Sequence, residues 1–226
     1  MNRRKVILGG LATLSLGGLL LSGRFGSIGS TSLSPLASPA NAQSAPSDVD
    51  TSGIVEMTMG DPEAKVTVIE YASFTCPHCA TFHTGPFKQL KADYIDTGKV
   101  KFIYREVFFD RFGLWGSMIA RCGGQEKFFG IADLIYKGQS DWTSAGEPAA
   151  IIEELRKIGR LAGLDNEALD ACLKDGEKAE ALVAWYQQNA EADGINSTPS
   201  FVIDGEKHAN MSYDDMKELL DAALEG

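Results

Sequence analysis

Two cysteines in the sequence are separated by only two residues, in the order Cys76-Pro77-His78-Cys79. Such a pair can form a disulfide and exchange it with other thiols. Proline is favoured at the first position of a helix, so the motif predicts a helix that begins at Pro77, with Cys76 as its N-cap. Cys79 then lies one turn further on, where its sulfur can reach that of Cys76.

The predicted place of Cys76 at a helix N-terminus has a chemical consequence. Free backbone N–H groups point towards its sulfur and lower the pKa of the thiol by stabilising the thiolate. A protonated or hydrogen-bonding His78 would stabilise that thiolate further. Because a stable thiolate favours the reduced pair, the disulfide becomes a stronger oxidant, by about 30 mV for each pKa unit below the ambient pH.

Two other interpretations of the motif remain open. An inert structural disulfide would close a very small loop and would add little stability. A metal could be bound by Cys76, Cys79 and His83, but no fourth ligand is visible nearby, and zinc sites of this type usually combine two ligand pairs. We expect redox chemistry without a metal or other cofactor, and we expect His83 and His208 to be ordinary surface or packing residues.

The residues around the motif predict the elements that position it. Residues 65–71 are β-branched and apolar and predict a buried strand directly before the motif, and residues 100–108 predict a second strand. Between them a helix is expected over residues 77–95, interrupted at Gly85-Pro86. Strand, helix and strand form one βαβ unit with a right-handed crossover.

A long block of helical periodicity follows this unit. Helices are expected at 114–122, 126–136, 147–161, 166–173 and 177–192. So long a block cannot be a loop between two strands, and we therefore expect an all-helical module, at about 112–192, inserted into an α/β domain of residues 54–226.

The strand pattern returns after the helical block. A short strand is expected at 200–203, then a hairpin turn at Asp204-Gly205 and a second short strand at 206–208. Ser212 and Asp215 resemble a capping box at the start of a last helix.

The other two cysteines, Cys122 and Cys172, lie on apolar faces of predicted helices in the inserted module. Both are expected to point inward, and a bond between them would close a loop of about 50 residues, worth roughly 4 kcal/mol in the chain-entropy model. We predict a structural disulfide, with two separate buried thiols as the alternative.

The first 42 residues have the parts of a secretory signal. A basic start at 3–5 precedes an apolar stretch at 6–21, and small residues end the segment at Ala42. Two arginines in the basic start match a twin-arginine signal in part. We expect cleavage after Ala42 and export, with an uncleaved membrane anchor as the alternative, because the apolar stretch is slightly shorter than the roughly 17–25 residues of a membrane-spanning helix.

Composition restricts what the exported part can do. The chain of 226 residues has 21 Lys and Arg against 31 Asp and Glu, a net charge of −10. No basic cluster follows the first few residues, so the acidity argues against nucleic-acid binding. Residues 43–53 are predicted to be a flexible tail. That tail is too short for a dimerisation stalk, so we expect a monomer.

The motif together with the helical insertion and Thr198-Pro199 before a strand resembles the DsbA family of thioredoxin-fold oxidoreductases. The resemblance covers about residues 58–226. It implies a thioredoxin-like fold in which Cys76 is the exposed, attacking cysteine and Cys79 is its buried partner. It also implies that Pro199 is a cis-proline facing the disulfide and that Thr198 contacts the bound peptide through its backbone.

The resemblance also draws attention to Glu70, on the strand six residues before Cys76. A family carboxylate at this place lies beneath the active site, and a buried Glu with a raised pKa could accept the proton of Cys79. A half-exposed Glu70 paired with a lysine is the alternative.

The function implied by the resemblance is periplasmic thiol oxidation. The Cys76–Cys79 disulfide would accept electrons from the cysteines of exported proteins, and a DsbB-type, quinone-linked membrane partner would reoxidise the pair. Two alternatives remain. One is a reductase or isomerase, which Thr198 before the proline favours slightly, and the other is a metal-binding module.

Overall fold

A mixed five-stranded sheet carries the region around the motif. The computed structural model describes residues 49–226; the predicted signal at 1–42 and residues 43–48 of the predicted tail lie outside this part of the chain. The strand order is β1-β3-β2-β4-β5. The strands are β1 (Met57–Met59), β2 (Val66–Ala72), β3 (Val100–Glu106), β4 (Ser200–Ile203) and β5 (Glu206–Ala209).

The centre of the sheet contains the predicted βαβ unit. β2 and β3 are parallel, with Val66 opposite Val100 and Ala72 opposite Glu106. β4 is antiparallel to β2, β5 to β4, and β1 to β3. Because β2 lies between two strands and is covered on both faces, its sequence is a nearly continuous run of buried residues.

The crossover between β2 and β3 is helical but broken. It consists of α1 (Pro77–Thr84), α2 (Pro86–Leu90) and a π-helical turn, η1 (Lys91–Ile95). The break falls at Gly85-Pro86, where it was predicted, because proline cannot donate the backbone hydrogen bond that would continue the helix.

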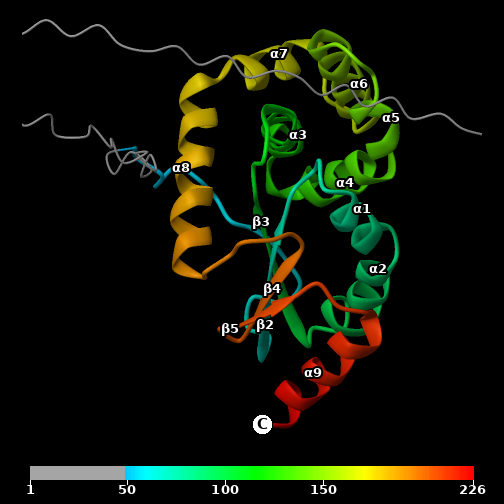
Figure 1. Cartoon of the computed structure of the whole chain (residues 1–226), viewed down its shortest axis with the longest axis vertical. Helices are drawn as coiled ribbons and strands as arrows, with labels where there is room; N and C mark the ends of the chain where they lie inside the picture. The colour runs from blue at the N-terminus through cyan, green and yellow to red at the C-terminus, as the bar shows by residue number, and fades with distance from the viewer. Residues whose placement is uncertain (1–48) are drawn as a thin grey trace, which may run out of the picture. The chain divides into compact units, whose positions relative to one another are not determined.

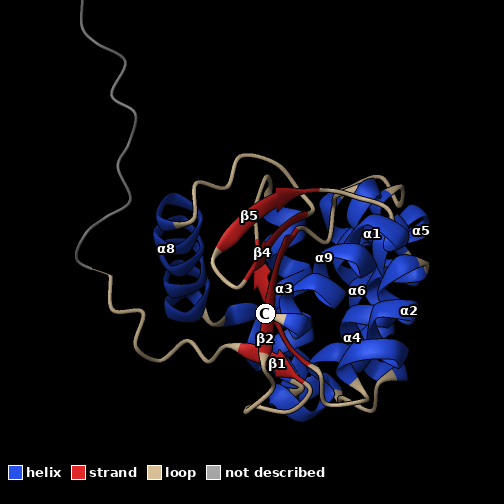
Figure 2. Ribbon diagram, turned by 90° about the horizontal axis from the view of Figure 1, so that it is seen from below, coloured by secondary structure: helices blue, strands red, loops and turns tan. Residues whose placement is uncertain are grey.

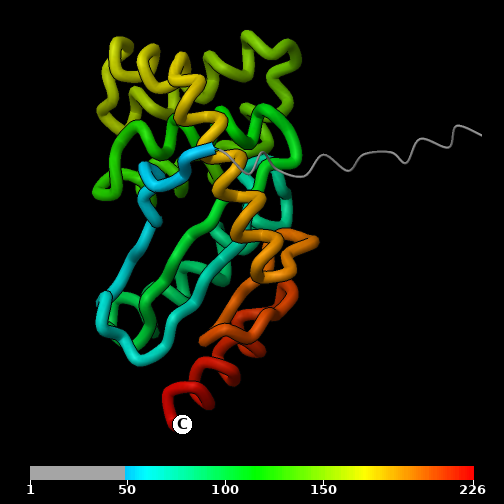
Figure 3. The backbone as a smooth tube through the Cα atoms, turned by 90° about the vertical axis from the view of Figure 1, so that its left-hand side faces the viewer, coloured from blue at the N-terminus to red at the C-terminus, as the bar shows by residue number. Residues whose placement is uncertain are grey.

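A helical module is inserted between β3 and β4, which confirms the predicted fold class. It comprises α3 (Arg111–Cys122), α4 (Gly124–Lys137), α5 (Gln139–Thr143), α6 (Pro148–Leu161), α7 (Asn166–Lys174) and α8 (Gly176–Ala192), and α9 (Tyr213–Glu225) ends the chain. Figures 1 and 3 show α3 to α7 gathered beyond one end of the sheet, with α8 running back alongside it. In Figure 2, α8 lies on one side of the sheet, and α1, α2 and α9 lie on the other.

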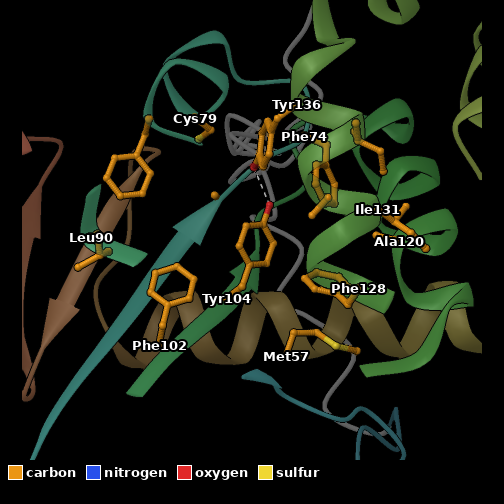
Figure 4. Close-up of a cluster of buried hydrophobic side chains, with 14 of the residues drawn as sticks. Met57, Phe74, Cys79, Leu90, Phe102, Tyr104, Ala120, Phe128, Ile131 and Tyr136 are labelled. Carbon is orange, nitrogen blue, oxygen red and sulfur yellow. Dashed lines mark hydrogen bonds between the residues drawn. The ribbon is translucent and has the colours of Figure 1, made fainter. Parts of the chain in front are cut away.

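One apolar core joins the sheet to the helical module. It contains Phe102 and Tyr104 from β3, Phe128 and Ile131 from α4, and Cys79 from α1, all almost fully buried (Figure 4). A buried ion pair reinforces this junction, since Arg121 on α3 donates to both carboxylate oxygens of Glu106 at 2.5 and 2.7 Å. The module and the sheet therefore pack as one unit around the motif.

Several details differ from the sequence prediction. The short edge strand β1 and the five-residue helix α5 were not predicted, because segments so short carry little periodicity. β3 ends at Glu106 rather than at residue 108. α3 begins at Arg111 rather than at 114, because the side chain of Asp110 accepts hydrogen bonds from the backbone N–H groups of Phe112 and Gly113.

Residues 49–53, at the end of the predicted tail, lie against α8. Lys178 donates a hydrogen bond to the carbonyl of Gly53 at 3.3 Å, and the Thr51 hydroxyl is 3.3 Å from the side-chain oxygen of Gln188. Within residues 49–226, every helix is either too short or too polar to cross a membrane.

Candidate active site

Cys76 lies at the junction between the sheet and α1. It is the N-cap of α1, its backbone is extended (φ −83°, ψ 118°), and Pro77 is the first helical residue, as the motif predicts. Cys76 keeps 9% of its surface exposed and Cys79 keeps none. Cys76 is thus the more accessible of the two. It is less exposed than the resemblance implies, because most of its surface is covered. Both are free thiols in this structure.

The surroundings of Cys76 stabilise its thiolate. A hydrogen bond from the Cys79 thiol is the largest of several effects that together lower the pKa of Cys76 to about 5. Burial of the sulfur opposes them, while the Thr198 side chain and the backbone N–H groups of Cys79 and His78 act in the same direction as Cys79. The ordinary value for a cysteine is 9.0, so a large fraction of Cys76 is thiolate at neutral pH.

Cys79 has the opposite character. Burial raises its pKa far above the ordinary value, and the hydrogen bond to Cys76 and the negative charge of Glu70 raise it further. In the reduced protein, one sulfur is therefore ready to act as a nucleophile or a leaving group, and the other holds its proton.

His78 and Pro77 lie between the two cysteines on the surface, and both are exposed. His78 stabilises the Cys76 thiolate through its backbone N–H. Among the residues that the structure describes, its ring forms no hydrogen bond with another side chain or backbone group.

The loop before β4 completes the site. The Thr198-Pro199 peptide bond is cis, and the main-chain oxygen of Thr198 is 3.5 Å from the sulfur of Cys76. Pairing of β4 with β2 brings the two loops together, since Ser200 lies opposite Tyr71 near the end of β2. The predicted substrate-contact residues thus lie directly beside Cys76.

Glu70, on β2, is completely buried, and its negative charge acts on Cys79. One carboxylate oxygen, Oε2, is 2.8 Å from Nε2 of His83 on α1. The alternative of a half-exposed Glu70 paired with a lysine is therefore wrong. His83 is also buried, and its ring binds Glu70 instead of joining Cys76 and Cys79 as a third metal ligand.

Two further residues hold the active-site loop and were not identified from the sequence. Gln139, the first residue of α5, is buried and donates hydrogen bonds to the carbonyl oxygens of Phe74 (2.7 Å) and Cys76 (3.0 Å). Asp110, the N-cap of α3, accepts a hydrogen bond from the Thr75 hydroxyl at 2.9 Å. A helix-capping Asp is visible in a sequence, whereas nothing marks Gln139 as a loop anchor.

The second cysteine pair lies within the helical module. Cys122 at the end of α3 and Cys172 on α7 are joined by a disulfide; their Cα atoms are 5.8 Å apart, and the two residues are 50 positions apart in the sequence. His208 is half-buried on the hairpin strand β5, whose other residues are exposed.

Comparison with known proteins agrees with this geometry. A family model described as thioredoxin matches residues 52–222. A putative protein-disulfide oxidoreductase from Rickettsia bellii is 34% identical over 75% of this chain and 65% of its own length. Disulfide bond formation protein D from Bacillus subtilis is 25% identical over 74% of this chain and 77% of its own length. The chain spans slightly less than two thirds of the length of the rickettsial relatives.

A solved structure with the same arrangement is that of α-DsbA1 from Wolbachia pipientis. It superposes with a TM-score of 0.70 at 28% sequence identity, covering 75% of this chain and 91% of that protein. The family match covers the sheet, the cysteine motif and the helical insertion together. The chain therefore belongs to the thioredoxin family and is a DsbA-like member of it.

Proposed function

We infer that this chain is a protein thiol–disulfide oxidoreductase that donates its Cys76–Cys79 disulfide to exported proteins. The contrast between the two sulfurs carries this inference: the pKa of Cys76 is lowered to about 5, and that of buried Cys79 is raised. At pH 7, a Cys76 pKa of about 5 raises the reduction potential of the pair by about 60 mV compared with a thiol that stays protonated, because the thiolate stabilises the reduced form. Such a pair accepts electrons readily.

The reaction follows from the two environments. A client thiolate attacks the Cys76 sulfur, the Cys76–Cys79 bond breaks, and Cys79 takes up a proton. A second client thiolate then attacks the client sulfur of the mixed disulfide and releases Cys76 as a stable thiolate. Two electrons pass from the client to the cysteine pair, and the client keeps the new disulfide.

The partners follow from the same chemistry. The substrates are cysteine-containing proteins, whose backbone would bind beside Thr198 and Pro199, next to the attacked sulfur. The signal-like segment at 1–42 supports a periplasmic location. There a DsbB-type, quinone-linked membrane protein would reoxidise the pair, and the chain would act as a monomer that needs no cofactor beyond its own disulfide.

The reduction potential tests this direction of electron flow. The purified protein is equilibrated with glutathione buffers, and the fraction of reduced Cys76–Cys79 is measured after acid quenching. A value near about −120 mV supports an oxidant, and a value near about −270 mV would instead support a reductase. Refolding of a reduced, disulfide-containing client should be accelerated by the oxidised protein and not by its Cys76→Ser variant.

A further inference from the structure

A pocket lies between α2 and α4, on the side of the sheet away from α8 (Figure 2). Its volume is about 400 Å³, which is in the range of small-molecule sites. Residues of β1, α1, α2, η1 and α4 line it. The pocket is separate from the cysteine pair, because His83, which lines it, is seven positions after Cys76 and so lies roughly 10 Å further along α1.

Aromatic rings form the less exposed walls of the pocket. Phe87 and Phe129 are half-buried, and His83 keeps only 4% of its surface exposed. The rings of His83 and Phe87 are in contact, with centroids 4.7 Å apart. Met59 adds a thioether, which also packs well against aromatic rings. These walls therefore suit a ligand with an aromatic ring, since such rings pack favourably on one another.

One polar atom of these walls lacks a partner. Nε2 of His83 is 2.8 Å from Glu70, whereas Nδ1 forms no hydrogen bond with any residue of 49–226. Nδ1 is also not among the fully buried, unpartnered atoms of that part of the chain, so it reaches solvent through the pocket that His83 lines. A ring nitrogen placed in this way can bind a polar group of a ligand, because imidazole can donate or accept.

Three lysines line the pocket. Lys88 and Lys137 are exposed, and Lys91 is half-buried. Lys91 is paired with Asp96 at 2.5 Å and Lys137 with Asp133, whereas Lys88 has no carboxylate partner in the described part of the chain. Three lysines against one aspartate thus line the pocket, in a chain whose net charge is −10. The pocket is a local cationic site on an acidic protein, and it should attract anions.

Gly130 keeps one wall of the pocket open. It lies in the interior of α4, where glycine is less favourable than alanine, and its φ is not positive, so the backbone does not require glycine. A Cβ added at this position would meet no atom within 4 Å, so close packing does not require glycine either. An open pocket wall explains the glycine, whereas backbone geometry and packing do not.

We propose that this pocket is a second binding site, for a small aromatic anion. The aromatic ring packs against Phe87 and Phe129, and the anionic group lies at the lysines. Because the site is separate from the cysteine pair, this inference does not rest on the proposed function.

Equilibrium dialysis of the purified protein against 2-naphthalenesulfonate tests the proposal. At low ionic strength we expect one bound sulfonate per chain, with a Kd below about 1 mM. Uncharged 2-naphthalenesulfonamide should bind about fivefold more weakly or worse, because it lacks the charge that the lysines attract. Added salt should weaken the binding of the sulfonate and not that of the sulfonamide.

A lysine variant tests the charge of the pocket. Lys88→Gln/Lys137→Gln should weaken the binding of the sulfonate about fivefold or more and leave that of the sulfonamide within about twofold. The matched control is Lys127→Gln/Lys157→Gln, which removes the same net charge at two exposed lysines that do not line this pocket. This control should bind both compounds like the unsubstituted protein.

A glycine variant tests the space. Gly130→Leu adds a side chain at the open wall and should weaken the binding of both compounds by about tenfold or more. Leucine is a better helix former than glycine, so thermal unfolding should show a fold at least as stable as before. The control is Gly176→Leu at the start of α8, where a Cβ also meets no atom within 4 Å but no wall of this pocket is present.

Absence of saturable sulfonate binding up to about 10 mM would overturn the inference. Unchanged binding in Gly130→Leu would also overturn it, because the sulfonate would then lie elsewhere. The same holds for equal weakening in the two lysine variants, or for a sulfonamide bound as tightly as the sulfonate, since the lysines of the pocket would then not select an anion.

Discussion

The main-chain oxygen of Thr198 lies 3.5 Å from the sulfur of Cys76, although 122 positions separate the two residues. The contact exists because β4 pairs with β2 and so places the loop before β4 beside the loop after β2. A carbonyl oxygen can only accept, so it binds the Cys76 thiol but not the thiolate. When Cys76 ionises, this acceptor loses its donor, and other groups must stabilise the sulfur.

The stability of the reduced protein should depend on pH through Cys76. Its pKa in the folded state, about 5, lies below the ordinary 9.0, so ionisation stabilises the folded form above pH 5 and this contribution is lost as pH falls towards 5. The free energy of unfolding of the reduced protein, relative to the oxidised protein, should rise between pH 5.5 and 8. We expect up to about 1.4 kcal/mol per pH unit, and less where solvent screens the sulfur.

Urea titrations of the reduced and the oxidised protein at several pH values measure how the difference in their unfolding free energies changes with pH. In Cys76→Ser, the difference in unfolding free energy between the protein with and without reductant should no longer vary with pH between 5.5 and 8. If this difference changed with pH in Cys76→Ser as much as in the unsubstituted protein, the pH dependence would come from groups other than Cys76.

Gln139→Leu should weaken the active-site loop. The substitution removes the amide that donates to the carbonyl oxygens of Phe74 and Cys76. The Cys76 oxygen still accepts from the backbone N–H of Ala80, but the Phe74 oxygen loses its donor in a buried place, which costs about 1–3 kcal/mol of unfolding free energy. Gln125→Leu is a suitable control, because Gln125 also donates to a backbone carbonyl, that of Glu56, but is exposed. Denaturant unfolding should show a loss of less than about 1 kcal/mol for the control. Equal losses in both variants would contradict a special role for Gln139.

The Cys122–Cys172 disulfide should stabilise the helical module. It closes a loop of 50 positions, so the double variant Cys122→Ala/Cys172→Ala should lose about 4 kcal/mol of unfolding free energy in the chain-entropy model. Thermal unfolding without reductant measures the loss. A double variant as stable as the unsubstituted protein would show that the bond constrains the unfolded chain little.

Local sequence signals were sufficient to predict the elements that carry the cysteine motif. A buried strand, a Pro-initiated helix and a Gly-Pro break each leave a short-range pattern, and all three are present. The pairing of His83 with Glu70 was missed, because it joins residues from a helix and a strand whose relative positions depend on packing. The four-residue spacing of Cys79 and His83 was a signal that could have indicated it.

Gln139 shows a different limit of sequence reasoning. It belongs to a helix of five residues, and its role depends on how α5 packs against the active-site loop. A single glutamine in a polar segment gives no indication of burial, since glutamine is mostly exposed in proteins. Only the fold shows that its amide holds two carbonyl groups of the loop that carries Cys76.

Direct titration of the Cys76 thiol tests the central claim. Thiolate absorbance near 240 nm, or the rate of alkylation by iodoacetamide, is followed against pH in the reduced protein, with Cys76→Ser as the control. The account predicts a transition near pH 5 that disappears in Cys76→Ser. A transition between about pH 8 and 9, as in a free cysteine, would contradict it and remove the basis for an electron-accepting disulfide.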